Sequence, residues 1–191
     1  MRLCVFCGAS AGRDPAYVAL ARSVGGGLAA RGIGVVYGGG RVGLMGALAD
    51  AAIEAGGEVI GVIPDRLVGR ELAHRSVTEL RVVDTLHDRK ALMAELSDGF
   101  IALPGGFGTL EELTEVVSWA QLDLHAKPIG LLGPRGYWDG LLGWLDQVVA
   151  EGFIAPHHRT LIAVDPDLDA LLERFALWSP PSPRRADPPG D

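Results

Sequence analysis

The feature that most constrains the fold is an alternation of short apolar runs with longer stretches of helical periodicity. The runs "LCVFCG", "GVVYGGG" and "EVIGVIP" are apolar on both faces of an extended chain, which is typical of strands in a parallel sheet covered by helices on each side. The alternation therefore predicts an α/β fold, a Rossmann-like doubly wound parallel sheet with helices on both faces. The predicted helices span about residues 14–31, 43–55, 85–97, 110–124, 137–151 and 166–178, and further strands are predicted in "ELRVVD", "GFIALPGG" and "KPIGLLG".

The chain length indicates one domain. With 191 residues, the chain is long enough to bury a sizeable core in a single unit. The last stretch, "SPPSPRRADPPGD", is rich in proline and nearly devoid of apolar side chains, so it cannot bury enough surface to order itself. We expect a domain over residues 1–178 and a disordered tail over residues 179–191.

Charge and composition exclude several classes of protein. The net charge of −7 argues against nucleic acid as a partner, and no apolar run is long enough to cross a membrane. The N-terminus lacks the zones of a signal peptide, so we expect a cytoplasmic protein. Cys4 and Cys7 lie in a predicted strand and point to opposite faces, which favours core packing over a redox pair. No zinc pattern is present, and no cofactor or metal is expected.

Three predicted strand-to-helix junctions carry glycine or other small residues. They are "CGAS" at 7–10, "YGGGRVGLMG" at 37–46 and "PGGFGT" at 104–109. Ligands of doubly wound sheets bind beyond the carboxyl ends of the strands, so one site lined by all three junctions is expected. The spacing Gly38-x-Gly40-x-x-Gly43, with Asp65 after the next strand, also matches a dinucleotide fingerprint, and an NAD(P)-dependent oxidoreductase is therefore an alternative.

The third junction suits an anion. Gly105, Gly106 and Gly108 allow a close approach of the backbone to a ligand, and a helix that starts at Thr109 would direct its free amide groups at a phosphate. A plain turn that needs glycine only for its geometry is the alternative. If Thr109 is the N-cap, Glu112 completes a T-x-x-E capping box.

Two charged residues occupy unusual positions on the predicted helices. Arg89 falls in the middle of an apolar stripe, whereas Lys90 is displaced by about 100° and is expected to reach solvent or the rim. A buried guanidinium needs a carboxylate or a phosphate as partner. Of the three glutamates in "LEELTE", Glu112 lies nearest the buried edge. Arg89 and Glu112 therefore form either a structural ion pair or part of a ligand site.

The segment "DRKALMAELSDGFIALPGGFGTLEELTEVVSWAQLDLHAKPIGLL" resembles the Lonely guy family of cytokinin-activating nucleoside 5'-monophosphate phosphoribohydrolases. The likeness extends from "CVFCGAS" to "EGFIAP". It implies hydrolysis of the N-glycosidic bond of a purine riboside 5'-monophosphate, a small-molecule substrate, and a homodimer. It implies Arg89 and Glu112 as the catalytic pair. It also implies substrate contacts for Lys90, Glu71 and the loop Gly105, Gly106, Phe107, Gly108, Thr109, Leu110 and Glu111, with Ser10, Gly39 and Gly40 lining the pocket.

Several alternatives stay open at this point. A non-catalytic nucleotide sensor or carrier would need the glycine loop but not a buried arginine facing a glutamate. A lysine decarboxylase, a label that relatives have carried, would need a Schiff-base lysine, and the chain has only Lys90 and Lys127. The base, either isoprenoid-modified adenine or another purine, is not determined, because Met93 and other apolar residues near the loops fit a base pocket and core or dimer packing equally well.

Overall fold

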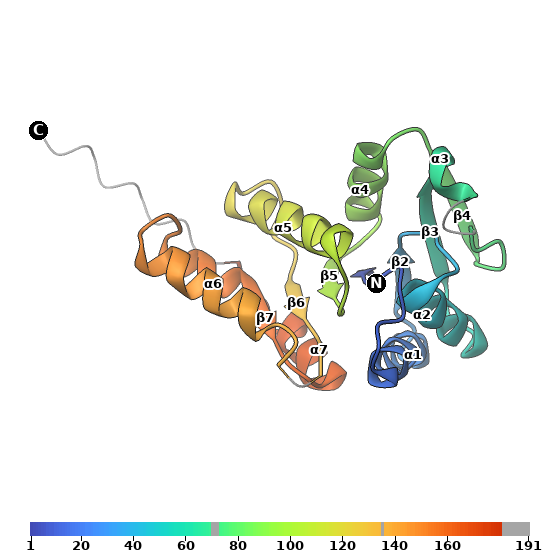
Figure 1. Ribbon diagram of the computed structural model, residues 1–191, viewed down its shortest axis with the longest axis horizontal. Coiled ribbons are helices and arrows are strands. Elements are labelled where there is room, and N and C mark those ends of the chain that lie inside the picture. The colour runs from blue at the N-terminus through green and yellow to red at the C-terminus, as the bar shows by residue number, and fades with distance from the viewer. Residues whose placement is uncertain (70–72, 135, 181–191) are drawn as a thin grey trace, which may run out of the picture.

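The computed structural model describes residues 1–69, 73–134 and 136–180 (Figure 1). Seven strands form one sheet in the order β4-β3-β2-β1-β5-β6-β7, and every neighbouring pair is parallel. The predicted α/β fold is confirmed. The strands are β1 Arg2–Phe6, β2 Gly34–Tyr37, β3 Val59–Pro64, β4 Glu79–Val83, β5 Gly99–Ala102, β6 Ile129–Leu131 and β7 Ile162–Val164.

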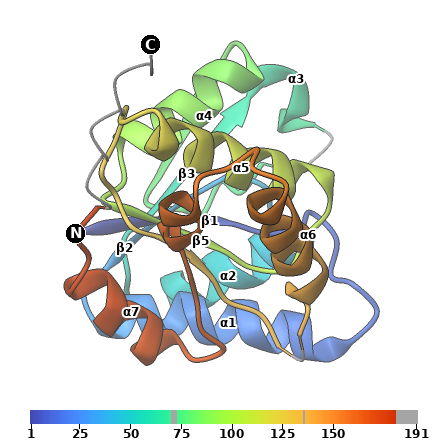
Figure 2. The ribbon, with the colours of Figure 1, turned by 90° about the vertical axis from the view of Figure 1, so that its left-hand side faces the viewer.

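Helices cover both faces of the sheet (Figure 2). Helices α1, α2 and α7 pack on one face, and α4, α5 and α6 pack on the other. The helices are α1 Pro15–Ala30, α2 Gly43–Glu54, α3 Asp65–Val68, α4 Leu86–Glu95, α5 Phe107–Gln121, α6 Asp139–Ala150 and α7 Leu168–Ala176, with a 3-10 turn, η1, at Pro156–Leu161.

The alternation of side chains along β1 shows why these apolar runs form central strands. Cys4 packs in the core on the α4–α5 side, and Cys7, just beyond the strand, packs on the α1–α2 side. Both cysteines are buried and free. The prediction that they are core residues on opposite faces is confirmed, and burial raises the pKa of both thiols, which disfavours thiolate chemistry.

The strand order places a switch point between β1 and β5. From β1 the chain adds β2, β3 and β4 on one side, and then β5, β6 and β7 on the other. The loops that leave β1 and β5 therefore diverge to opposite faces and leave a crevice between them, which is where doubly wound folds bind ligands. Among the described residues, no helix is long and apolar enough to cross a membrane.

The structure corrects some predicted boundaries. Helix α5 begins at Phe107, with Gly106 as its N-cap, rather than at Leu110 with Thr109 as the cap. The short elements α3, η1 and β7 were not predicted. The predicted disordered tail lies almost wholly outside the described residues.

Candidate active site

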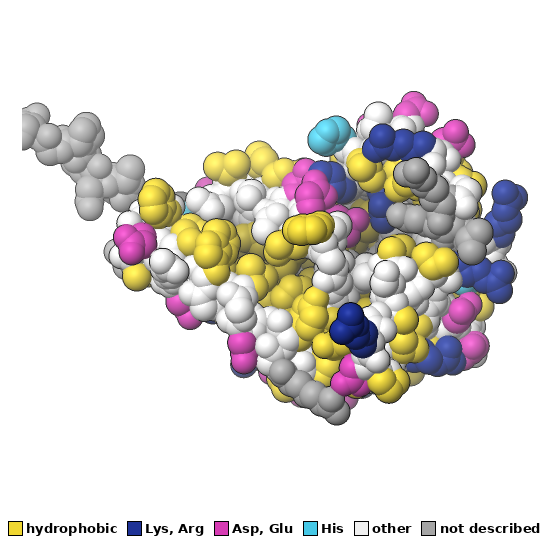
Figure 3. Space-filling model, in the orientation of Figure 1, with side chains coloured by type: hydrophobic (Ala, Val, Ile, Leu, Met, Phe, Trp, Pro, Cys, Tyr) yellow, Lys and Arg dark blue, Asp and Glu magenta, His cyan; other side chains and the backbone are white. Residues whose placement is uncertain are grey.

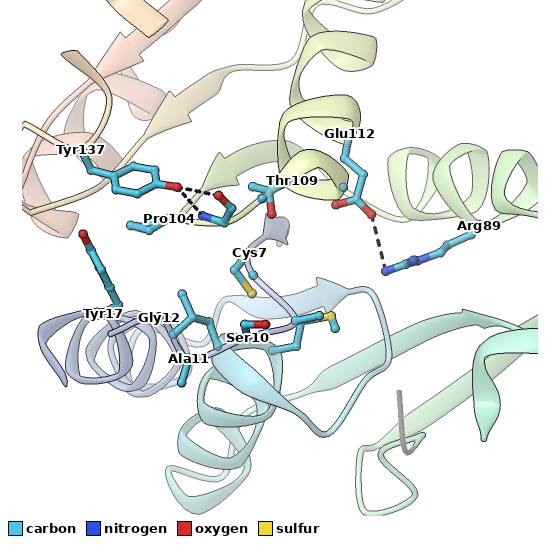
Figure 4. Close-up of a pocket in the computed structure, with 17 residues that line it drawn as sticks. Cys7, Ser10, Ala11, Gly12, Tyr17, Arg89, Pro104, Thr109, Glu112 and Tyr137 are labelled. Atoms are coloured by element: carbon cyan, nitrogen blue, oxygen red, sulfur yellow. Dashed lines mark hydrogen bonds and ion pairs between the residues drawn. The ribbon is translucent and has the colours of Figure 1, made fainter. Parts of the chain in front are cut away.

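A pocket of about 450 Å³ opens at the switch point (Figure 4). Its walls come from the loop after β1, the loop after β5 with the first turn of α5, helix α4, the start of α2 and the segment before α6. The β1 and β5 loops are joined by a hydrogen bond in which the Gly8 amide donates to the Pro104 carbonyl (3.0 Å). The residues that line the pocket include Cys7, Ser10, Tyr17, Met45, Arg89, Gly105, Gly106, Gly108, Thr109, Glu112 and Tyr137.

The glycine loop presents an uncapped helix terminus to this pocket. Among the described residues, no side-chain hydrogen bond caps this helix at its N-cap Gly106, and the first amides of a helix have no partner within the helix. A Cβ on Gly105 would lie 2.0 Å from Thr109 Oγ1, so only glycine fits there, whereas a Cβ on Gly106 or Gly108 would meet open space. The loop therefore leaves backbone amides accessible at a helix N-terminus, an arrangement that favours a bound anion.

Thr109 has a different role from the one expected. It is the third residue of α5, not its cap, and it is only 3% exposed. The predicted T-x-x-E capping box with Glu112 is therefore wrong. Glu112 is then the sixth residue of α5 rather than the third, so a capping box no longer accounts for it.

Arg89 and Glu112 meet at one end of the pocket (Figure 4). Arg89 Nη2 lies 3.5 Å from Glu112 Oε1, and the two side chains are 8% and 11% exposed. The predicted burial of Arg89 is confirmed. So is the prediction that Glu112 is the most buried of the three glutamates, since the other two, Glu111 and Glu115, are 57% and 23% exposed.

The guanidinium of Arg89 lies directly on the backbone of the second glycine junction. A Cβ on Gly38 would be 1.9 Å from Arg89 Nη2 and 3.0 Å from Met45 Sδ. Within the described part of the chain, Arg89 Nε is buried without a hydrogen-bond partner. A buried donor left unpaired is costly, so this nitrogen suits a ligand or water in the pocket.

Lys90 is not at the rim, as the helical wheel had indicated, but buried. Its Nζ donates to Glu111 and, at 3.0 Å, to Glu115 Oε1. Burial lowers the pKa of Lys90, but the hydrogen bonds and charges of the two glutamates outweigh it, and the net pKa is raised. Lys90 is therefore a cation that ties α4 to α5.

The remaining glycines of the second junction contact protein rather than the pocket. Gly39 packs against Ile63 and accepts a hydrogen bond from the amide of His74, and Gly40 forms a bridge with Ala73. These contacts give no support to a dinucleotide-binding loop. Gly39 and Gly40 were predicted to line the pocket and do not line it.

The other predicted site residues divide into four groups. Ser10 lines the pocket. Met93 is 1% exposed within the core cluster, because α4 turns it toward the sheet, and it does not line the pocket. Leu110 and Glu111 lie outside the pocket and line a neighbouring apolar groove on α5 and α6. Glu71 lies outside the described residues.

Sequence reasoning missed the aromatic end of the pocket. Tyr17 and Tyr137 contact each other edge to face, with ring centroids 5.7 Å apart, at the opposite end from Arg89 and Glu112 (Figure 4). Neither tyrosine stands in a recognisable motif. Over the ranges that the structure covers, no group of three or more His, Cys, Asp or Glu side chains could hold a metal ion.

Comparisons with known proteins found a matching family and similar sequences. Residues 45–175 match a family described as "possible lysine decarboxylase". A probable cytokinin riboside 5'-monophosphate phosphoribohydrolase of Oryza sativa subsp. japonica is 51% identical over 179 residues, covering 94% of this chain and 79% of the relative. A cytokinin riboside 5'-monophosphate phosphoribohydrolase of Arabidopsis thaliana is 49% identical over 179 residues, covering 94% and 83%.

Solved structures share the fold. The molybdenum cofactor binding protein of Rippkaea orientalis superposes with a TM-score of 0.70 at 22% identity, covering 92% of this chain and 95% of that one. The molybdenum cofactor carrier protein of Chlamydomonas reinhardtii gives a TM-score of 0.67 at 22% identity, covering 92% and 98%. At this identity the likeness concerns the fold alone.

Proposed function

This chain belongs to the Lonely guy family, which contains the cytokinin riboside 5'-monophosphate phosphoribohydrolases, and on that premise we propose that it hydrolyses the N-glycosidic bond of a purine riboside 5'-monophosphate. The products are the free base and ribose 5-phosphate. The observation that carries this proposal is the buried Arg89–Glu112 pair in the same pocket as an uncapped helix N-terminus.

The substrate phosphate would bind at the first turn of α5. The accessible amides and the helix dipole favour a dianion there. Gly106 and Gly108 leave space beside the backbone, so a phosphate can approach closely. Anchored in this way, the nucleotide uses binding energy far from the scissile bond to hold C1' near Glu112.

Glu112 would act on the positive charge that develops on the ribose. Breaking the glycosidic bond builds positive charge on the ribose, and a carboxylate in a poorly solvated site stabilises that charge or activates the attacking water. Glu112 is 11% exposed, so its charge is weakly screened by solvent. Water attacks C1' as the bond between C1' and the purine nitrogen breaks. The water passes its proton to a proton acceptor, and the departing purine nitrogen takes up a proton.

Arg89 would act on the other side of the bond. The departing purine gains electron density, which a fixed cation offsets, and the guanidinium also orients Glu112 across 3.5 Å. Because an arginine side chain stays protonated in proteins, we assign Arg89 electrostatic stabilisation and orientation rather than general acid catalysis.

A decarboxylase is not supported, although the matched family has that description. A pyridoxal phosphate enzyme needs a lysine that can lose its proton. The pKa of Lys90 is raised by two glutamates, and Lys127 Nζ donates to the Ala94 carbonyl at 2.7 Å. Lys90 and Lys127 are the only lysines of the chain.

We also propose that the protein is a homodimer. An apolar groove beside the glycine loop is lined by Phe107, Leu110, Leu141 and Trp144, and Phe107 is 94% exposed. Hydrophobic side chains gather over α5 and α6 (Figure 3). A second copy covering this face would bury them. Light scattering should give twice the chain mass for the wild type and a monomer for Trp144→Glu, whereas a monomeric wild type would contradict the dimer.

A cytoplasmic location is part of the same proposal. The two cysteines are free and buried on opposite faces of the sheet, as expected of a protein from a reducing compartment. Cell fractionation would test it.

The proposed reaction is tested by chromatography of the base released from AMP and from isopentenyladenosine 5'-monophosphate. The corresponding nucleosides without phosphate are the controls. Release from the monophosphates alone is expected, and the ratio of the two rates identifies the preferred base. Binding of both monophosphates without release would instead favour a nucleotide sensor.

A further inference from the structure

We propose that Tyr137 is a positioning residue that sets the conformation of the phosphate-binding loop; this inference rests on the proposed function. The Tyr137 hydroxyl donates to the Gly105 carbonyl (2.5 Å) and accepts from the Gly105 amide (3.1 Å). A phenol hydroxyl has one proton to donate. Tyr137 donates this proton to the carbonyl of the same residue whose amide donates to its hydroxyl oxygen. One side chain therefore fixes both polar groups of one loop residue.

Gly105 is well placed to determine the conformation of the loop. It lies between the first turn of α5 and the loop after β1, because a Cβ there would be 2.0 Å from Thr109 Oγ1 and 2.9 Å from the Gly8 nitrogen. A glycine-rich loop has wide conformational freedom. Fixing the orientation of Gly105 limits the directions of the amides that follow it in the first turn of α5, and such preorganisation strengthens binding.

Tyr137 is itself held by its neighbours. Its ring contacts Trp138 edge to face at 4.9 Å and Tyr17 at 5.7 Å. It reaches the loop from the segment before α6, an element that belongs to neither the β1 nor the β5 loop (Figure 4). These ring contacts fix the orientation of the Tyr137 side chain, so its hydroxyl is held in place against the loop.

This arrangement also specifies which amides bind phosphate. The Gly105 amide is occupied by Tyr137, so the donors are the amides of the first turn of α5 beyond Gly106. If Gly105 were itself a phosphate donor, removing the Tyr137 hydroxyl would free its amide and tighten binding. The proposal predicts the opposite sign.

The test is Tyr137→Phe, which removes the hydroxyl and keeps the ring contacts. Tyr37→Phe is the matched control, since the Tyr37 hydroxyl is buried without a partner in the described part of the structure and Tyr37 does not line the pocket. Two quantities are measured: kcat and KM for AMP, and the dissociation constant of ribose 5-phosphate by calorimetry. Thermal unfolding checks that each variant is folded.

For Tyr137→Phe we expect KM and the ribose 5-phosphate dissociation constant to rise together by about five- to thirtyfold, the range for one or two lost hydrogen bonds. The kcat should change less than about threefold, and Tyr37→Phe should match the wild type. Unchanged or tighter binding overturns the proposal. A loss of kcat and thermal stability with unchanged KM also overturns it, because it indicates a merely structural role.

The calorimetric measurement separates this inference from the proposed reaction. If the wild type binds ribose 5-phosphate but releases no base, the hydrolase proposal fails while the Tyr137 effect is still measured. If the wild type does not bind ribose 5-phosphate at all, the phosphate loop and the role of Tyr137 fail together.

Discussion

At the scale of single residues, the site depends on a guanidinium packed against bare backbone. Arg89 Nη2 occupies the space that any side chain at position 38 would need. Glycine at position 38 is therefore required by the packing of Arg89 rather than by a ligand. The cation is held between Gly38, Met45 and Glu112, which restricts its position relative to the carboxylate.

Replacing Gly38 by alanine should displace Arg89. We expect kcat/KM for AMP to fall roughly a hundredfold, since misplacing a catalytic group by about 1 Å has that effect. Gly26→Ala is the control, because its Cβ would have only the Ala51 carbonyl nearby, at 3.9 Å. In a helix interior that change should raise the free energy of unfolding by about 0.5–1 kcal/mol. Wild-type kinetics in Gly38→Ala would contradict the packing argument.

The sequence was sufficient to predict some site residues and not others. Arg89 and Glu112 lie on amphipathic helices, where a period of 3.6 residues shows which charges face inward. The position of Lys90 was predicted wrongly, because a wheel assigns direction but cannot show that Glu111 and Glu115 of another helix surround the ammonium. Tyr17 and Tyr137 are far apart in the sequence, on a helix and on a loop, and their contact depends on tertiary packing.

At the scale of elements, α4 and α5 act as one unit. The adjacent residues Arg89 and Lys90 of α4 contact three glutamates of α5. The two glutamates bound by Lys90 are four residues apart, on one face of α5, and Glu112 lies on the neighbouring face toward Arg89. Lys90 thus fixes how α5 is rotated against α4 and where Glu112 points.

Lys90→Met should weaken this connection. Removing one partner of a buried ion pair is destabilising, but Glu111 is more than half exposed, so we expect a loss of about 1–3 kcal/mol in urea unfolding. Arg81→Gln, which breaks an exposed pair with Glu79, should change stability by less than about 0.5 kcal/mol. Equal effects of the two substitutions would contradict the role given to Lys90.

The raised pKa of Lys90 makes the stability difference between wild type and Lys90→Met depend on pH. A lysine whose pKa is higher in the folded than in the unfolded state contributes stability below its ordinary value of 10.5, and loses it as the pH rises through the folded value. The stability difference between wild type and Lys90→Met should therefore be constant from pH 7 to 9 and shrink above about pH 10.5. No change up to pH 12 would contradict the ion-pair account.

The start of α5 shows where element prediction failed. Glycine is unfavourable in helices, so a start after Gly108 was the natural prediction, yet the helix includes Phe107 and Gly108. Contacts of Gly105 with Thr109 and Gly8 bring the chain into the helix earlier, and tertiary contacts outweigh propensity. Strand β7, Ile162–Val164, was not predicted at all.

At the scale of the whole molecule, fold class was predictable and strand order was not. Strands buried on both faces are uniformly apolar, so the sequence reveals a covered parallel sheet. The order in which β1 lies between β2 and β5 depends on pairing between distant segments, and nothing in the apolar runs encodes it. The domain boundary near residue 178 stays a prediction, and Trp178 still contacts the fold through its Nε1 bond to Ala126 O (2.9 Å).

Acid should destabilise the folded protein through His125. Its Nε2 lies 2.9 Å from the Val116 carbonyl and its Nδ1 accepts from the Lys127 amide, which fits a neutral ring. Burial lowers the pKa of His125 below its ordinary 6.5. The unfolded chain then binds a proton that the folded chain does not, so stability falls as the pH drops below about 6.5.

Thermal unfolding at pH 7.5 and 5.5 checks this. His125→Asn should lose less stability on acidification than the wild type does, whereas His87→Asn, at an exposed position, should lose as much as the wild type. The same acid sensitivity in all three proteins would contradict the assignment to His125.

The measurement that tests the central claim most directly is the steady-state release of base from AMP by Glu112→Gln, which keeps the shape of the side chain and removes its charge. Glu95→Gln, at an exposed position of the neighbouring helix α4, is the control. We predict that Glu112→Gln lowers kcat by roughly 10²–10⁴ while KM stays within about threefold, and that Glu95→Gln matches the wild type. A folded Glu112→Gln that retains more than about a tenth of the wild-type kcat would contradict the claim that this carboxylate stabilises the transition state or activates the water.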